Sequence, residues 1–118
     1  MVKKSKIPME HYTIVGLQYR TTKEARRHLA TKVPFSVYFR REKKNEYDPN
    51  AIAVFVADKQ FLAGQHIGYL RKEVAAVISP RVDKGEARLP AFGIVDSMNV
   101  DKGTAEVKMS LGKPKLPS

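Results

Sequence analysis

Apolar residues occur at every second position through much of this chain, and this alternation limits the possible folds more than any other feature. In the clearest run, residues 33–40, the apolar members are Val33, Phe35, Val37 and Phe39. Successive side chains of a strand point to opposite faces, so this run predicts a strand with one buried face. Similar short apolar runs predict strands at residues 12–19, 33–40, 51–56, 64–70, 86–95 and 104–111.

Two segments have helical spacing instead. In residues 70–85 the apolar positions of one face are Leu70, Val74, Val77 and Ile78. Pro80 is expected to break or restart this helix and Gly85 to stop it. A second, polar helix is predicted at residues 22–30. Six short strands with one or two helices indicate a mainly β protein, a small OB-like barrel with a helix plugging one end. Gly68, inside the fourth strand, predicts a bulge or a close backbone approach.

The charge of the chain is uneven. The formal net charge is +10, and residues 1–45 carry twelve lysines and arginines against three acids, whereas residues 46–118 carry ten against nine. A concentrated positive field favours polyanions, chiefly nucleic acid or an anionic membrane surface. The alternative is a cationic surface that serves only solubility.

Composition narrows the class of protein further. The chain has no cysteine, which excludes disulfides and thiolate zinc sites. No apolar run approaches the about 18 residues of a membrane span, and residues 1–12 lack the apolar core of a signal peptide. We expect a cytoplasmic protein, nucleoid-associated if it is bacterial, without a membrane partner. One domain is expected at residues 11–112, between a basic arm at 1–10 and a flexible tail at 113–118.

The sequence contains few residue patterns that indicate a catalytic site. His11, His28 and His66 are too scattered to form a metal-ligand pair on one element, and no glycine-rich phosphate loop is present. A metal nuclease site built from Asp48, Asp58 and His66 would need three separate loops to converge. The sequence therefore predicts a non-enzymatic protein without metal or cofactor.

Three blocks carry a family resemblance: "VGLQY" at residues 15–19, "RREKKNEYDPNAIAVFV" at residues 40–56, and "GQHIGYLRKEVAAVISPRVDKG" at residues 64–85. In order and spacing they resemble the HIRAN domain, over roughly residues 12–95. That module is best known at the N-terminus of fork-remodelling translocases and also occurs as small stand-alone bacterial or phage proteins. The resemblance implies an OB-like barrel that binds the 3′ end of single-stranded DNA and has no catalytic activity. This chain would be the module by itself, and a repair or helicase protein is a candidate second partner.

The resemblance assigns roles to individual residues. Tyr19, three positions after Gly16, and Tyr47 would stack on bases at the strand end. Asp48 would accept a hydrogen bond from the terminal 3′-hydroxyl, and Asn45 would hold the turn or contact the end nucleotide.

Further candidates come from the "YLRKE" block. The sequence also departs from the family pattern at two places. Lys72 would contact a phosphate, and Tyr69 of the same block is a DNA-binding candidate. Gln18 stands where the best-known eukaryotic member has arginine, so a phosphate contact is expected to be weaker. An aromatic of that member has no clear counterpart in residues 96–104, and residues 21–32 are longer than the eukaryotic connection.

Physical chemistry agrees with these roles. Aromatic faces stack on bases for about 1–3 kcal/mol each without demanding a sequence. Lysines bind phosphates and make the affinity depend on salt. A carboxylate in such a groove accepts a hydrogen bond from a 3′-hydroxyl but repels a 3′-phosphate, so Asp48 would select for the free end.

Structural interpretations stand beside the functional ones. Asp48 is expected to build an Asx-type turn, which is compatible with binding. Tyr47 is expected to pack partly on the barrel, and Tyr19 is alternatively a half-buried strand residue. Lys72 is alternatively only a residue of a first helical turn, where a cation gains nothing from the helix dipole.

The polar helix at residues 22–30 places Lys23, Arg26 and Arg27 on one face. We expect this face to extend the phosphate track, because burying three cations without partners would be costly. A solvated connector is the alternative.

Three functions therefore remain open: a module for DNA 3′ ends, a sequence-blind binder of single-stranded RNA or DNA, and a protein-interaction module with a basic surface. A titration of a 3′-hydroxyl oligonucleotide against its 3′-phosphate twin separates them, by preference, indifference or no binding.

Overall fold

The computed structural model describes residues 10–59 and 62–112, which form a closed six-stranded barrel. The predicted arm, apart from Glu10, and the predicted tail at 113–118 lie outside the described residues. In chain order the elements are β1 (Glu10–Val15), α1 (Leu17–Arg20), α2 (Lys23–Ala30), β2 (Phe35–Arg41), β3 (Ile52–Val56), β4 (His66–Leu70), α3 (Lys72–Asp83), β5 (Gly93–Asn99) and β6 (Thr104–Met109).

The barrel order is β1-β4-β3-β2-β5-β6, and the paired strands are antiparallel. Alternate residues of the strands fill the interior, which confirms the predicted mainly β, OB-like barrel. In β6, for example, Ala105, Val107 and Met109 are buried and the residues between them are partly exposed. Every residue of β3 is buried.

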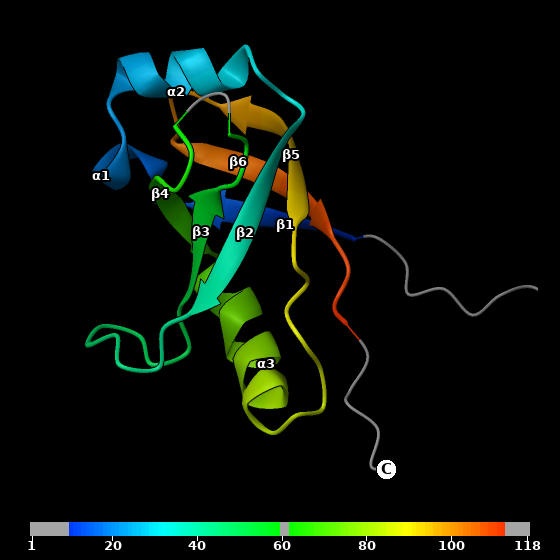
Figure 1. Ribbon diagram of the computed structural model, residues 1–118. Helices are drawn as coiled ribbons and strands as arrows, with labels where there is room; N and C mark the ends of the chain where they lie inside the picture. Colours follow the sequence, from blue (N-terminus) through cyan, green and yellow to red (C-terminus); the bar gives the residue numbers. More distant parts are fainter. Residues whose placement is uncertain (1–9, 60–61, 113–118) are drawn as a thin grey trace, which may run out of the picture.

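Helices close the two ends of the barrel (Figure 1). At one end α3 contributes Ala75 and Ile78 to the core, and at the other α2 contributes Leu29. The predicted plug is therefore confirmed. The structure described here contains no helix long and apolar enough to cross a membrane.

The first predicted strand is too long. β1 ends at Val15 because Gly16 adopts a left-handed conformation, with φ of 82°. Residues with a Cβ rarely adopt this φ. At Gly16 this conformation turns the chain into the four-residue helix α1. Gln18 and Tyr19 therefore lie on a helix rather than on a strand.

The fifth predicted strand starts too early. Residues 86–92 precede β5, which runs from Gly93 to Asn99. Arg88 pairs with Gly112 in an isolated bridge that is not part of β5. Pro90 has no backbone N–H to donate to a strand partner, which accounts for the later start.

α3 continues through Pro80 to Asp83, so the predicted break is wrong. Pro80 removes one backbone donor, but its carbonyl still accepts from Lys84 N at 3.1 Å. As expected, the helix ends before Gly85, whose φ is 78°. Val77 is 65% exposed rather than buried, because the face toward the barrel consists of Ala75, Ile78 and Ser79.

Gly68 has the predicted role. The pairing of β3 with β4 shifts register between Val54 and Phe55, opposite Gly68. A Cβ on Gly68 would lie 2.5 Å from the carbonyl oxygen of Val15. The glycine thus lets β1 and β4 approach closely beside the candidate site.

Candidate functional site

The loop between β2 and β3 consists of two hydrogen-bonded turns joined by Asn45. In the first turn Asn45 N donates to Glu42 O at 3.2 Å, and in the second Ala51 N donates to Asp48 O at 3.0 Å. Asn45 Oδ1 accepts from the backbone N of both Tyr47 and Asp48, each at 2.9 Å. This amide therefore fixes the position of the tyrosine and the aspartate relative to the barrel.

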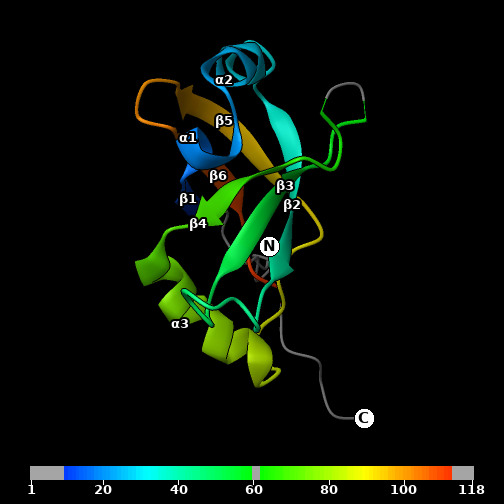
Figure 2. The same cartoon turned by 90° about the vertical axis from the view of Figure 1, so that its left-hand side faces the viewer.

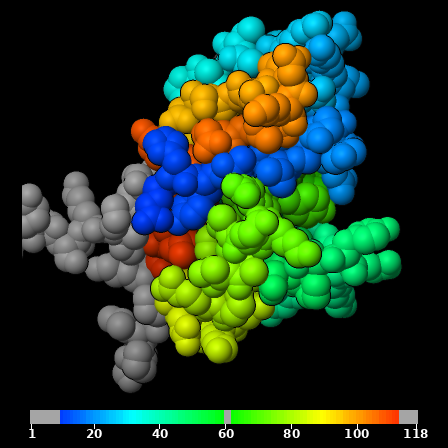
Figure 3. All heavy atoms as spheres, turned by 180° about the vertical axis from the view of Figure 1, so that it is seen from behind, coloured from blue at the N-terminus to red at the C-terminus, as the bar shows by residue number. Residues whose placement is uncertain are grey.

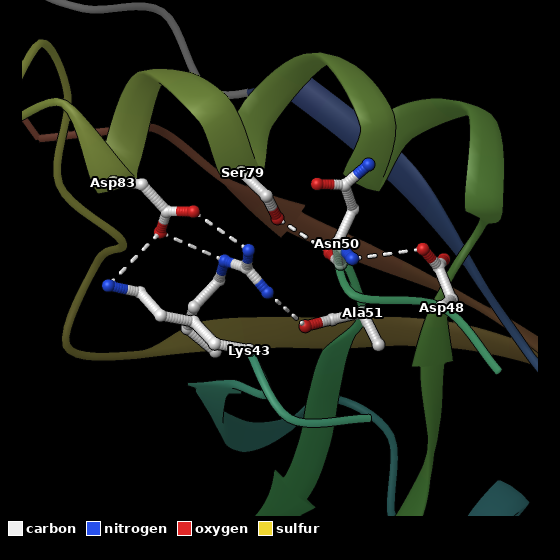
Figure 4. A network of polar contacts seen from close by, with 7 residues as sticks. Lys43, Asp48, Asn50, Ala51, Ser79 and Asp83 are labelled. Atoms are coloured by element: carbon white, nitrogen blue, oxygen red, sulfur yellow. Dashed lines mark hydrogen bonds and ion pairs between the residues drawn. The ribbon is translucent and has the colours of Figure 1, made fainter. Parts of the chain in front are cut away.

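α3 holds the same loop from the side (Figures 2 and 4). The Ser79 hydroxyl donates to Asn50 O at 2.6 Å. Arg41 donates to Asp83 through Nη2 at 2.8 Å and through Nε at 3.1 Å, and its Nη1 reaches Ala51 O at 3.3 Å. The Arg41 hydrogen bonds hold the pKa of Asp83 below its usual value. The loop is thus anchored at both of its ends.

Beside this loop lies a pocket of about 380 Å³. It is lined by Val15, Arg20, Asn45, Tyr47, Asp48, Ala51, Tyr69, Leu70 and Lys72. These residues come from the end of β1, from α1, from the loop, from the end of β4 and from the first residue of α3. In the view of Figure 3 the loop projects beside α3 and below α1. The pocket thus brings together five predicted residues: Asn45, Tyr47, Asp48, Tyr69 and Lys72.

A chain of polar contacts joins the walls of this pocket. Arg20 Nη2 donates to the Tyr69 hydroxyl at 3.3 Å, and this hydroxyl donates to Glu42 Oε1 at 3.0 Å. The same carboxylate oxygen accepts from Asn45 Nδ2 at 3.1 Å. Burial, and then the hydrogen bond to Glu42, raise the pKa of Tyr69. Its hydroxyl therefore stays protonated and donates over the physiological pH range.

Aromatic rings on the outer face of β2, β3 and β4 support Tyr69. The rings of Tyr38 and Phe55 stack at 5.1 Å, those of Phe55 and His66 at 4.8 Å, and His66 meets Tyr69 edge-on at 4.8 Å. His66 Nε2 also donates to Gly68 O at 2.9 Å. Burial, followed by the charge of Arg20, lowers the pKa of His66. The neutral ring completes the stack, and the stack fixes the orientation of Tyr69.

The two candidate stacking tyrosines are exposed. Tyr47 is 94% exposed and Tyr19 is 84% exposed, so the expected packing of Tyr47 on the barrel and the half-buried alternative for Tyr19 are both wrong. Tyr47 extends from a turn and Tyr19 from the short helix α1, and neither position lies over the core. Both rings are free to contact a ligand.

Of the remaining predicted residues, Asp48 lines the pocket, whereas Gln18 and Gly16 do not. Asp48 builds the expected Asx-type turn, because its Oδ1 accepts from Asn50 N at 2.9 Å. Among the described residues its Oδ2 has no hydrogen-bond partner. Gln18, in contrast, lies against Gly103 of the β5–β6 turn and does not line the pocket. Gly16 acts through its backbone, by ending β1.

The predicted face of α2 is not a continuous cationic track. Arg26 is only 7% exposed and donates through Nε to Val100 O at 2.8 Å and through Nη1 to Thr21 O at 3.0 Å. Backbone carbonyls compensate its burial, a possibility that charge spacing alone does not reveal. Lys23 pairs with Asp101 at 3.4 Å. Arg27 is exposed.

Sequence reasoning missed Arg20 and Glu42. Arg20 directly follows the candidate Tyr19, and Glu42 is the acid of the "RREKKNEYD" block, so a signal for each was present. The sequence did not show that both side chains share a hydrogen-bond partner, the Tyr69 hydroxyl of β4. The alternative metal site of Asp48, Asp58 and His66 is not assembled, because within residues 10–59 and 62–112 no three histidines and acids are placed to hold a metal ion.

Comparisons with known proteins identify relatives of the whole barrel. The family model described as the HIRAN domain matches residues 9–111. The crystal structure of the HIRAN domain of human HLTF is 26% identical and has a TM-score of 0.65, covering 91% of this chain and 78% of that one. A crystal structure of a Lactobacillus plantarum protein is 27% identical and has a TM-score of 0.67, covering 90% and 95%.

A third structure is that of the HLTF HIRAN domain in its DNA-bound conformation, solved by NMR. It is 25% identical, with a TM-score of 0.61, and covers 90% of this chain and 76% of that one. A comparison with curated protein sequences found no match.

Proposed function

The chain belongs to the HIRAN domain family, and from this premise we propose that it is a DNA-binding module that recognises the 3′-hydroxyl end of single-stranded DNA. The DNA-bound conformation of the HLTF HIRAN domain, which covers most of this chain, supports DNA as the ligand. Recognition of the end is inferred from the pocket.

One observation carries the proposal: a single pocket contains a highly exposed aromatic ring, a carboxylate and two cations. Tyr47 offers a ring face for a base, and Asp48 offers a carboxylate oxygen. Arg20 and Lys72 line the same pocket from α1 and α3. Each group matches one part of a terminal nucleotide, namely the base, the hydroxyl and the phosphate.

The carboxylate gives the pocket its selectivity. A 3′-hydroxyl donates a hydrogen bond, which Asp48 accepts, whereas a 3′-phosphate is an anion and is repelled at the same place. Asp48 is held in position by Asn45 and by its own bond to Asn50 N. These bonds hold the backbone of Asp48 and its Oδ1 within the turn, and Oδ2 is left for the strand end.

We further propose that the module is not catalytic and acts in DNA repair or replication-fork processing, in the cytoplasm and with a repair or helicase protein as its partner. Binding, stacking and end selection account for all the pocket residues named above. A motor or nuclease acting on the same strand would then supply the chemistry.

The test compares three ligands of one sequence: an oligonucleotide with a 3′-hydroxyl, the same oligonucleotide with a 3′-phosphate, and a closed circle. Fluorescence anisotropy at fixed salt should give the tightest binding for the 3′-hydroxyl. Asp48→Asn should reduce the preference over the 3′-phosphate, because the repulsion is removed while a hydrogen-bond acceptor remains.

Equal affinity for all three ligands would favour a sequence-blind binder, and the same titration with RNA would define its substrate. An absence of binding to every nucleic acid would favour the protein-interaction module.

A further inference from the structure

A second hollow lies along the first half of the loop between β2 and β3. Its volume is about 520 Å³, and it is lined by Arg41, Glu42, Lys43, Lys44 and Asn45. Asn45 lines both this hollow and the pocket that contains Asp48. We call residues 42–45 the basic turn, and Lys43 and Lys44 are its two central residues.

Two cations of this hollow remain available to a ligand. Arg41 is occupied by Asp83, but Lys43 is 4.0 Å from the same carboxylate and its side chain is 66% exposed. In the described part of the chain Lys44 forms no ion pair, and it is exposed. A contact of this length made by an exposed lysine contributes little, so Lys43 can exchange it for a phosphate, and Lys44 has no ion pair in the described residues to give up.

The acid within the basic turn, Glu42, is held by two hydrogen bonds. Glu42 directs its Oε1 to the Tyr69 hydroxyl and to Asn45 Nδ2, which lie on the pocket side. Glu42 lines the hollow together with the two lysines, and its Oε1 is oriented by partners that line the pocket, so the net charge of residues 42–45 remains positive.

The basic turn is also fixed relative to the pocket. Asn45 N closes it onto Glu42 O, and Asn45 Oδ1 binds the backbone of Tyr47 and Asp48 on the other side. Arg41, immediately before the turn, is anchored to α3 through its hydrogen bond to Asp83. The backbone that carries the two lysines is therefore held in place relative to the backbone of Asp48.

We propose that the basic turn is a second DNA-binding subsite, in which Lys43 and Lys44 bind phosphate groups upstream of the strand end held by Asp48. This inference rests on the proposed function and extends it from a terminal nucleotide to a longer strand. It also moves the phosphate track from α2, where Arg26 is buried, to the loop at the opposite end of the barrel (Figure 1).

The experiment compares the full chain with a Lys43→Gln/Lys44→Gln variant. The ligands are a thymidine dinucleotide and a thymidine decanucleotide, both with a free 3′-hydroxyl. The variant should bind the decanucleotide more weakly, and its slope of log affinity against log salt should flatten by about 0.7 for each lost phosphate contact. Affinity for the dinucleotide should change little.

A matched control removes two exposed charges at the other end of the barrel, in Arg27→Gln/Lys102→Gln. This control should leave the salt slope for the decanucleotide nearly unchanged. An equal loss in both double variants would overturn the subsite, since it would reflect net charge alone. An unchanged slope in the lysine variant would overturn it as well.

The two proposals fail in different ways. If the lysine variant loses affinity for the dinucleotide to the same degree as for the decanucleotide, the basic turn belongs to the end pocket and no separate subsite exists. If the wild-type chain binds 3′-hydroxyl and 3′-phosphate dinucleotides equally, end recognition is wrong, whatever the lysine variant does with longer strands.

Discussion

The Tyr69 hydroxyl and the Glu42 carboxylate, 27 residues apart in the chain, are joined by a hydrogen bond of 3.0 Å. The bond connects the end of β4 to the loop that carries Tyr47 and Asp48. Because Glu42 Oε1 also accepts from Asn45 Nδ2, one carboxylate positions two walls of the pocket.

Glu42→Ala is expected to weaken binding of a 3′-hydroxyl oligonucleotide by about 1–2 kcal/mol, the range of one or two side-chain hydrogen bonds. The direction is informative, because removal of an acid from a basic surface would otherwise strengthen DNA binding. Anisotropy titrations measure the change. Glu46→Ala, at an exposed acid of the same loop, is the control and should bind as tightly as wild type or more tightly.

Tyr47→Ala and Tyr19→Ala should each weaken binding by about 1–3 kcal/mol and leave the thermal unfolding midpoint nearly unchanged, because both rings are exposed. Tyr→Phe at either position should have a smaller effect, since the ring face is kept. Wild-type affinity in both alanine variants would show that the stacking surface lies elsewhere.

Arg20→Gln should lower affinity and flatten the salt slope by about 0.7, since one phosphate contact of a single strand is lost. Gln18→Ala should leave the affinity unchanged, because Gln18 lies against the β5–β6 turn rather than in the pocket. A loss of affinity in Gln18→Ala together with a wild-type affinity and salt slope in Arg20→Gln would place the phosphate at position 18. Titrations at several salt concentrations distinguish the two outcomes.

Arg26→Gln is expected to destabilise the fold by about 1–3 kcal/mol, because the partly buried carbonyls of Val100 and Thr21 lose a charged donor. Urea unfolding should show this as a lower midpoint. Arg27→Gln, at the neighbouring exposed position, should remain within about 0.5 kcal/mol of wild type. Equal stability of the two variants would contradict the conclusion that the hydrogen bonds of Arg26 stabilise the fold.

His66 should make stability depend on pH. Its pKa in the fold lies below the usual value of 6.5, so the unfolded chain binds the proton at higher pH than the folded chain does. The free energy of unfolding should therefore be largest above about pH 6.5 and decrease as the pH falls below that value. Urea unfolding at neutral pH and at about pH 5 measures the decrease.

His66→Phe should reduce this pH dependence, because it keeps a ring beside Phe55 but cannot take up a proton. It also loses the bond to Gly68 O, so its stability at neutral pH should be lower than that of wild type. An identical pH dependence in the two proteins would assign the effect to other groups.

The sequence by itself determined the barrel, five of its six strands approximately, the helix that plugs it, and the loop motif around Tyr47 and Asp48. These features are local. Alternation reports which side chains of a strand are buried, and the asparagine and aspartate of the loop bond to backbone groups within a few residues of themselves.

Only the tertiary structure decided the roles of Arg20, Glu42 and Arg26. Arg20 and Glu42 meet through Tyr69 of β4, and Arg26 is buried because the carbonyl of Val100, 74 residues later, lies beside it. The charge spacing of α2 was compatible with a phosphate track or a solvated connector, and it contained no information about that carbonyl. A cation is exposed or buried according to the partners that the fold brings to it, and those partners are distant in sequence.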